Sequence, residues 1–248
     1  MRPRWDSGPA ALTLVRHAES VGNLADQAAR DAGAEVLDLK VRDADVDLSD
    51  NGRDQAAALR DWLATRDPET LPTLVVASPY RRAADTAAIA LEGLDVAVEY
   101  DDRLRERDLG ALDGLTGAGI RARHPEEADR RDQLGKFYYQ PPSGESWADV
   151  AQRVRSLLND LRFGYDGERV WLFTHQAVLM TFRYVLEDLA EPDLMDLERR
   201  TPVPNASLTT YRREGAFFEL ETFAETAPVD QGADVTHEEP QAGRGSDA

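Results

Sequence analysis

Three short apolar stretches, each followed at once by polar side chains and then by a helix-forming segment, constrain the fold of this chain most strongly. They are 11–15 (Ala-Leu-Thr-Leu-Val), 73–77 (Thr-Leu-Val-Val-Ala) and 169–174 (Arg-Val-Trp-Leu-Phe-Thr). Apolar runs of this length are typical of strands that are buried on both faces. Because strands that alternate with helices are joined by right-handed crossovers, we expect an α/β fold: a mostly parallel central sheet flanked by helices in an α/β/α sandwich.

The segments between and after these strands complete the predicted architecture. Helices are expected over 19–32, 49–63 (with Ser49 as its N-cap), 83–91, 147–161 and 177–189, a third strand in chain order over 95–100, and a closing C-terminal hairpin from 207–212 and 216–223. Residues 115–144 mix cations, acids and aromatics between core elements, which favours a small cap insertion.

Composition excludes several kinds of partner and chemistry. With 248 residues, 42% of them hydrophobic, the chain has no apolar run that approaches the length of a bilayer span. It has no cysteine, which excludes disulfides and thiolate chemistry and fits a cytoplasmic location. The net charge of -18 argues against nucleic acid or an anionic membrane as a partner, because such a surface repels phosphate. An anion site would therefore need a local concentration of arginine and histidine.

Such a concentration is predicted at one edge of the sheet. Arg16 and His17 follow the first strand, Arg82 lies just beyond the second, and His175 follows the third apolar strand directly. The carboxyl ends of parallel strands meet at the same edge, where ligands bind in open α/β sheets. The planar fork of arginine matches phosphate oxygens in a bidentate manner, so tetrahedral oxyanions are the expected ligands.

Two chemistries could use this pocket. The histidines could bind a metal ion, but adjacent guanidinium groups repel a dication, and the local sequence has no His-x-x-x-His pair. Alternatively, a neutral imidazole attacks phosphorus and becomes phosphohistidine, with the arginines neutralising the phosphoryl oxygens and no metal or cofactor required. A carboxyl group such as Glu106 would protonate the leaving alcohol.

A calcium site in the acidic connection before the second helix is a weaker alternative. Asp43, Asp45 and Asp47 alternate as the first ligands of an EF-hand loop do. The sixth position of that loop should be glycine and is Leu48, and the twelfth should be glutamate and is Asp54. We therefore expect a solvated acidic loop.

The motifs resemble those of a known family. Residues 14–23, Leu-Val-Arg-His-Ala-Glu-Ser-Val-Gly-Asn, resemble the L-x-R-H-G-E-x-x-x-N signature of the histidine phosphatase superfamily, phosphoglycerate-mutase-like branch. Further similar motifs follow in chain order: Leu48-Ser49 with Gly52 and Gln55-Ala56, Ser78 with Arg82-Ala83 and Thr86-Ala87, Glu106-Arg107 with Gly110 and Gly114, Gly144-Glu145-Ser146, and Thr174-His175. Together they cover about residues 11–210, and matches in this order are not expected by accident.

The resemblance implies a role for each matching residue. His17 would carry the phosphoryl group and Glu106 would be the proton donor, while the phosphate would be held by Arg16, Arg82, His175 and Asn23. Ser20, and Gln176 through its backbone N–H, are further candidates for substrate binding. Two positions depart from the family pattern, since Ala18 and Gln176 replace glycines. The Gln176 side chain could narrow the pocket, so specificity is where a difference is expected.

The resemblance also sets the predicted domains and function. We expect a flexible lead-in over 1–9, a histidine-phosphatase-like catalytic domain over 10–223 with its cap at about 115–144, and an acidic disordered tail over 224–248. A phosphomonoester hydrolase for a small phosphorylated metabolite is favoured. A mutase is the alternative, but family mutases typically carry a longer insert than the interval between Gly114 and Gly144. A non-catalytic phospholigand binder would usually lack the nucleophile or the acid.

The cap aromatics Phe137, Tyr138 and Tyr139 permit two readings. They could grip the leaving group or simply anchor the lid. The substrate and the oligomeric state are left open by the sequence.

Overall fold

The computed structural model describes residues 2–230 and 232–237, and a six-stranded sheet is its centre. The strand order is β3-β2-β4-β1-β5-β6, with β1 at Ala11–Arg16, β2 at Leu74–Ala77, β3 at Val98–Tyr100, β4 at Arg169–Thr174, β5 at Leu208–Glu214 and β6 at Phe217–Glu225. Strands β3, β2, β4 and β1 run parallel to one another, and the β5–β6 hairpin joins β1 through an antiparallel pairing of β5 with β1. The predicted fold class, mostly parallel with a C-terminal hairpin, is confirmed.

Eight helices surround the sheet in the part of the chain that is described. They are α1 at Val21–Asp31, α2 at Asp50–Leu63, α3 at Arg81–Ala90, α4 at Gly117–Arg123, α5 at Pro125–Leu134, α6 at Trp147–Asp160, α7 at Gln176–Leu186 and α8 at Glu191–Arg200. Helix α8 is not among the helices expected from the sequence, because it is rich in charged residues and buries only Leu194 completely. Ser49 caps α2 as expected, since its hydroxyl accepts a hydrogen bond from the Gly52 N–H.

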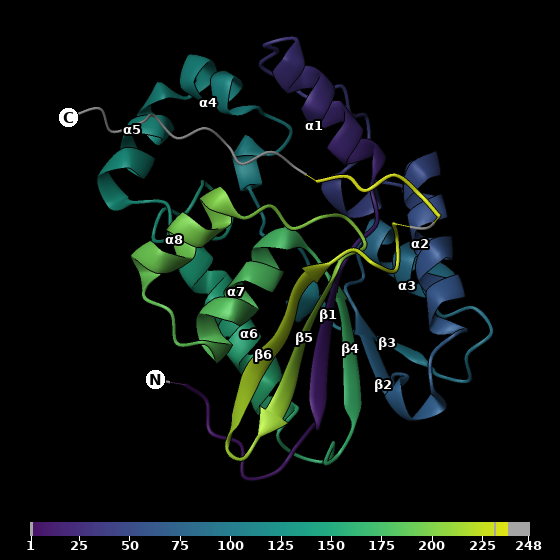
Figure 1. Cartoon of the computed structure of the whole chain (residues 1–248). Helices are drawn as coiled ribbons and strands as arrows, with labels where there is room; N and C mark the ends of the chain where they lie inside the picture. Colours follow the sequence, from purple (N-terminus) through teal and green to yellow (C-terminus); the bar gives the residue numbers. More distant parts are fainter. Residues whose placement is uncertain (1, 231, 238–248) are drawn as a thin grey trace.

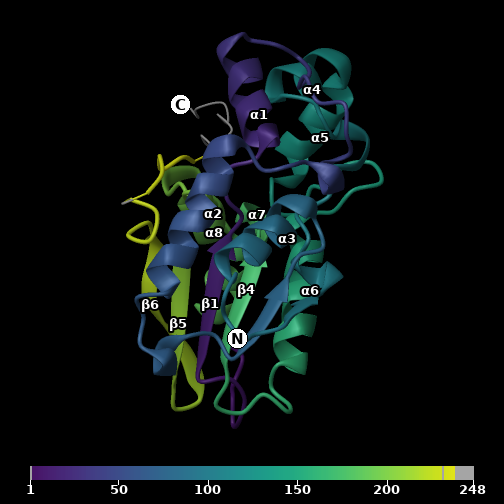
Figure 2. The same ribbon diagram turned by 90° about the vertical axis from the view of Figure 1, so that its right-hand side faces the viewer.

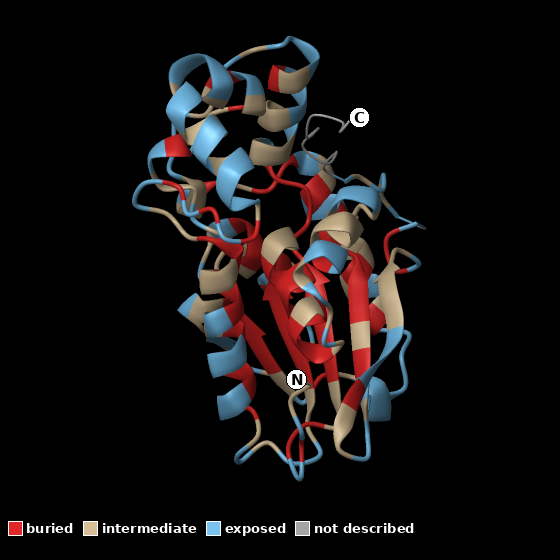
Figure 3. Ribbon diagram, turned by 90° about the vertical axis from the view of Figure 1, so that its left-hand side faces the viewer, coloured by how far each residue is buried: buried red, intermediate tan, exposed pale blue. Residues whose placement is uncertain are grey.

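The central strands divide their side chains between two cores. Because successive strand residues point to opposite faces, Leu12 and Leu14 of β1 face one side and Val15 faces the other. The first core holds the apolar faces of α6 and α7, and the second holds those of α2 and α3. Figure 1 shows the sheet between these two helix pairs, and Figure 3 shows that the central strands β1, β2 and β4 are buried along most of their length. Burial on both faces explains why these strands are continuous apolar runs in the sequence.

One end of the sheet carries the third group of helices. Helices α1, α4 and α5 stand together beyond the carboxyl ends of the parallel strands, as Figures 1 and 2 both show. The α4–α5 cap is fastened to the segment after α1: Val36 and Leu115 form a β-bridge, and the Thr116 hydroxyl donates to the Ala34 carbonyl at 2.7 Å. The cap thereby lies over the edge where the polar residues were expected.

The two chain ends differ from expectation. The lead-in was predicted to be flexible, but Trp5 is 1% exposed, packs edge-on against Phe218 with ring centroids 4.9 Å apart, and donates its backbone N–H to the Ala216 carbonyl. Its indole supplies the apolar area that holds the segment in place.

The predicted disordered tail also begins too early. Strand β6 extends to Glu225, Val229 is fully buried, and the Thr236 carbonyl accepts a hydrogen bond from the Asn205 N–H. Residues 231 and 238–248 of the predicted tail lie outside the described residues.

No helix within the described residues has the length and apolar character needed to cross a membrane.

Candidate active site

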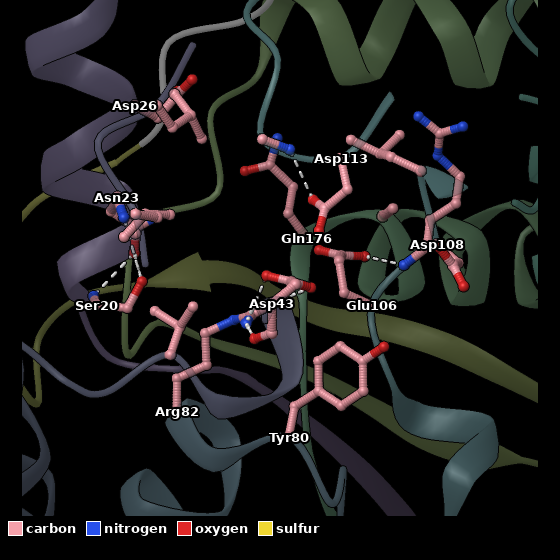
Figure 4. Close-up of a pocket in the computed structure, with 18 of the residues that line it drawn as sticks. Ser20, Asn23, Asp26, Asp43, Tyr80, Arg82, Glu106, Asp108, Asp113 and Gln176 are labelled. Carbon is pink, nitrogen blue, oxygen red and sulfur yellow. Dashed lines mark hydrogen bonds and ion pairs between the residues drawn. The ribbon is translucent and has the colours of Figure 1, made fainter. Parts of the chain in front are cut away.

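A cleft of about 500 Å³ opens at the carboxyl end of the sheet, between α1 and the cap. Its lining includes six of the eight predicted site residues: His17, Ser20, Asn23, Arg82, Glu106 and Gln176. The other two, Arg16 and His175, lie directly behind the cleft surface, where they are 1% and 0% exposed. The topology thus brings together groups that are separated by up to 159 positions in the chain, as Figure 4 shows for several of them.

His17 is buried at the tip of β1 and held in one orientation. Its Nδ1 lies 2.8 Å from the Ala18 carbonyl oxygen, which can only accept a hydrogen bond, so Nδ1 carries the ring proton. Burial lowers the pKa of His17 well below 6.5, and the positive charges of Arg82 and Arg16 lower it further. The ring is therefore neutral near pH 7, with a free electron pair on Nε2.

His175 lies beside His17, with ring centroids 5.1 Å apart. The Ser78 hydroxyl is 2.9 Å from its Nε2, while its Nδ1 is buried with no hydrogen-bond partner among the described residues. Burial, followed by the charge of Arg82, lowers the pKa of His175 well below 6.5. The ring of Tyr80 packs edge-on against it at 5.4 Å and completes its enclosure.

The two arginines reach the same place from different elements. Arg16 ends β1 and donates to the Val203 carbonyl, while Arg82 lies in the first turn of α3. Arg82 is 5% exposed, and its guanidinium forms hydrogen bonds with both the backbone carbonyl and the carboxylate of Asp43. Because Arg16 and Arg82 both lower the pKa of His17 and His175, their charges act on the two imidazoles together.

Ser20 and Asn23 have a clear structural task. The Ser20 Oγ accepts from the Asn23 N–H, and the Asn23 Oδ1 accepts from the Ser20 N–H at 2.9 Å, which is a capping box for α1. The sequence analysis missed a third member of this group, Asn205, whose side chain donates to the His17 carbonyl at 3.1 Å and to Asn23 Oδ1 at 3.4 Å. Asn205 lies in an irregular segment with no motif, so nothing in the sequence singled it out.

Two hydroxyls from the matched motifs support the histidines. Ser78 bonds to His175 as described above, and Thr86 accepts from the Ala18 N–H at 3.0 Å while donating to the Arg82 carbonyl. Ala18, the first departure from the family pattern, does not have a positive φ, so alanine is accommodated without backbone strain. The local backbone after His17 is therefore held from two sides, by α3 and by Asn205.

Glu106 and Gln176 both line the cleft and come from different parts of the chain. Glu106 accepts from the Arg107 N–H at 2.9 Å, and Gln176 is the first residue of α7. Figure 4 shows both side chains extending into the cleft near Asp113. Gln176 is thus part of the cleft lining, where its side chain occupies space. The amino termini of α1 and α7 also border the cleft, and their partial positive charge favours an anion.

Two cations stand on the cap side of the cleft, beside the acids Asp108, Asp113 and Glu198. Arg107 and Lys136 line it, both lie within about 6 Å of the Trp147 ring, and Lys136 pairs with Glu198 at 2.6 Å. Burial lowers the pKa of both Arg107 and Lys136. This wall would suit a polar or anionic leaving group.

Two of the three cap aromatics, Phe137 and Tyr139, anchor the cap to the rest of the protein or within itself. Phe137 lies in the core with α6 and α7, and the Tyr139 hydroxyl donates to Glu127 at 2.8 Å. Tyr138 is 54% exposed, and none of the three lines the catalytic cleft.

The acidic loop is exposed to solvent, as expected, and its carboxylates are also paired with arginines. Asp43 bonds to Arg82, Asp45 to Arg42 at 2.7 Å, and Asp47 to Arg81 at 2.7 Å. Each of the three carboxylates that alternate in the sequence therefore has a different arginine partner. The Arg81 side chain is 54% exposed.

The chain is similar to several known proteins. The chain is 34% identical over 171 residues to 6-phosphofructo-2-kinase/fructose-2,6-bisphosphatase of Gallus gallus, a match that covers 69% of this chain and 31% of that protein. It is 38% identical over 141 residues to a bifunctional protein of Mycobacterium tuberculosis, covering 56% of this chain and 37% of that protein. The chain thus spans about a third of the length of these curated relatives.

Solved structures match over nearly their whole length. The mycobacterial glucosyl-3-phosphoglycerate phosphatase in complex with inorganic phosphate superposes with a TM-score of 0.69 at 28% identity, covering 89% of this chain and 100% of that chain. YhfR of Bacillus stearothermophilus superposes with a TM-score of 0.70 at 25% identity, covering 89% of this chain and 99% of that chain. A family model described as histidine phosphatase superfamily, branch 1, matches residues 12–226. The predicted family is confirmed: this chain belongs to the histidine phosphatase superfamily.

Proposed function

We propose that this protein hydrolyses small phosphomonoesters through a phosphohistidine on His17, without a metal ion. The observation that carries the proposal is the state of His17: a buried neutral imidazole, with its proton fixed on Nδ1 by the Ala18 carbonyl, at the edge of a cleft that also holds Arg82 and Glu106. A neutral imidazole with one free electron pair is the form that attacks phosphorus.

The first step transfers the phosphoryl group. His17 Nε2 forms a bond to phosphorus as the bond to the ester oxygen breaks, and Glu106 gives its proton to the departing alkoxide. Negative charge on the phosphoryl oxygens is met by Arg16, Arg82 and His175. If the Ser78 hydroxyl donates to His175 Nε2, the proton of the neutral ring sits on Nδ1, the atom with no partner among the described residues, and can be donated to an oxygen.

The second step returns the enzyme to its starting state. Glu106, now ionised, takes a proton from water as the water oxygen attacks phosphorus, and the bond to His17 Nε2 breaks. Inorganic phosphate and the protonated acid result. Over the two steps, protons and charge balance: the products are the alcohol and inorganic phosphate, and His17 and Glu106 return to their starting protonation states.

Hydrolysis is preferred over mutase activity for two reasons. The interval from Gly114 to Gly144 holds only the short helices α4 and α5, which leaves the cleft connected to solvent. Two of the solved structures that match are named as a phosphatase. The relatives act on sugar bisphosphates and on a phosphoglycerate derivative by their names, so we propose a small polyol or sugar-acid phosphate, present in the cytoplasm, as the substrate class here.

The test compares wild type, His17→Ala and Glu106→Gln on p-nitrophenyl phosphate and on a panel of phosphorylated metabolites. We expect His17→Ala to lose turnover and wild-type activity to survive EDTA. Loss of activity in EDTA that zinc or magnesium restores would contradict the metal-free mechanism. Isomerisation of 3-phosphoglycerate to 2-phosphoglycerate without phosphate release would favour the mutase. Equal inactivity of wild type and His17→Ala across the panel would favour the phospholigand binder.

A further inference from the structure

The guanidinium of Arg82 is already occupied by a carboxylate of the same chain. Its Nη1 donates to the Asp43 backbone oxygen at 2.7 Å and to Oδ1 at 2.9 Å, and its Nη2 donates to Oδ2 at 3.2 Å. A guanidinium that grips two oxygens of one anion in this way uses the same geometry as it would on a phosphoryl group. Figure 4 shows the Asp43 side chain inside the cleft, between Arg82 and Glu106.

The two partners differ in how easily they can separate. The Arg82 side chain is 6% exposed, with its guanidinium carbon over the Tyr80 ring at 5.4 Å from the centroid, whereas the Asp43 side chain is 40% exposed. Asp43 belongs to the one-turn 3-10 segment Asp43–Asp45 (η1), where the neighbouring acid Asp45 points to solvent and pairs with Arg42. A rotation of the Asp43 side chain would return its carboxylate to water, while Arg82 would stay in place.

The backbone contact would keep the turn in position during that rotation. Only two of the three Arg82–Asp43 hydrogen bonds involve the carboxylate, and the third, to the Asp43 carbonyl, does not depend on the side chain. Replacing a carboxylate by a phosphoryl group on the same guanidinium therefore needs no movement of α3 or of η1.

The negative charge of Asp43 acts on other residues that line the cleft. After burial, it is the largest contribution that raises the pKa of Tyr80 and that of Asp113, both of which line the cleft. A phosphoryl dianion that entered with Asp43 in place would meet the same negative charge at close range. The carboxylate and the phosphoryl group cannot both occupy Arg82 without strong repulsion.

We infer that Asp43 competes with the phosphoryl group for Arg82, so that binding of a phosphomonoester requires displacement of the Asp43 carboxylate and this exchange lowers the affinity for phosphate. The inference rests on the proposed function, in which Arg82 holds the phosphoryl group. Displacing the Asp43 carboxylate from Arg82 costs the same free energy for every ligand with a phosphoryl group, including inorganic phosphate. Substrates whose leaving group gains contacts elsewhere in the cleft offset this cost, whereas inorganic phosphate does not. Release of the phosphate product is therefore favoured, and simple phosphate esters bind weakly.

The test measures the dissociation constant of inorganic phosphate by calorimetry at constant pH and ionic strength. Asp43→Asn keeps the size of the side chain and removes its charge, and Asp43→Ser serves as a second variant. We expect both to bind phosphate on the order of tenfold more tightly than wild type, a change equivalent to about 1.4 kcal/mol. KM for p-nitrophenyl phosphate should fall in the same direction.

Two controls separate this contact from a general charge effect. Asp45→Asn removes an acid from the same turn, and Asp26→Asn removes one from the same cleft that is paired with Arg30 at 2.7 Å. Both controls should leave phosphate affinity within about twofold of wild type. Equal tightening in Asp26→Asn would overturn the inference in favour of the net charge of the cleft.

A structural readout does not depend on any variant. In a crystal structure of the wild type with inorganic phosphate, we expect phosphate on Arg82 and the Asp43 carboxylate beyond hydrogen-bond distance of that guanidinium. Phosphate on Arg82 with the ion pair intact would overturn the inference, as would unchanged or weaker phosphate binding in Asp43→Asn. Either result with normal wild-type turnover leaves the proposed function standing, whereas absent turnover in wild type counts against the function itself.

Discussion

Gly52 should be essential for the geometry around His17, although it does not touch the cleft. It lies in the first turn of α2, where a Cβ would come within 1.9 Å of the Glu19 carbonyl oxygen and 2.8 Å of its carbon. To restore an ordinary contact of 3.4 Å, the Glu19 backbone and α2 would have to separate by about 1.5 Å. The Glu19 segment is two residues from His17, so this movement would reach the nucleophile.

The magnitude follows from that displacement. Overpacking of this kind costs about 1–3 kcal/mol, which corresponds to a fall in Tm of roughly 2–12 °C for a chain of this size. A misplacement of about 1 Å at a reacting group costs on the order of a hundredfold in rate. We therefore expect Gly52→Ala to lower both Tm and kcat, with a smaller change in KM.

The assay is a thermal melt by circular dichroism together with kinetics on p-nitrophenyl phosphate well below the melting transition. Arg53→Ala, the next residue and exposed to solvent, is the matched control and should behave like wild type. If Gly52→Ala melted within about 1 °C of wild type and kept kcat within twofold, the argument from backbone contact would be refuted.

Three further predictions concern the histidines and the chain start. Because the pKa values of His17 and His175 are lowered in the folded state, the free energy of unfolding should be highest above about pH 6.5 and fall below that pH by up to about 1.4 kcal/mol per pH unit for each ring. Denaturant unfolding at pH 7.5, 6 and 5 should show a weaker pH dependence of this free energy in His175→Asn than in wild type. An equal pH dependence in the two proteins would contradict the lowered pKa of His175. Ser78→Ala removes the partner of His175 Nε2 and should lower kcat about tenfold to hundredfold in steady-state assays, whereas unchanged kcat would show that the hydroxyl plays no part. Trp5→Ala should cost about 3–5 kcal/mol in urea unfolding because Trp5 is 1% exposed against Phe218, while a cost below 1 kcal/mol would restore the view of a loosely attached lead-in.

The sequence was sufficient for the framework and for the list of candidate groups. The strands around Leu14, Val75 and Leu172 could be predicted because burial on both faces requires an unbroken apolar run, and that requirement is visible in the chain itself. His17, Arg82 and His175 could be placed at one edge because parallel strands with helical crossovers leave no other arrangement.

Other features carry no local signal. The chain ends were misjudged because the burial of Trp5 and Val229 depends on surfaces made by β6 and α2, far away in the sequence. Asn205 was missed because its role consists of contacts to His17 and Asn23, residues more than 180 positions earlier.

The sequence by itself determined which elements form and which chemical groups stand at the strand ends, because the spacing of apolar residues and the motif residues are properties of neighbouring positions. Only the tertiary structure decided the protonation and the partners of those groups. The proton on His17 Nδ1, the neutral state of both histidines and the occupation of Arg82 by Asp43 all arise from burial and from contacts across the fold. Electrostatic energies depend on distance in space and on exclusion of water, and neither quantity is written in the order of residues along the chain.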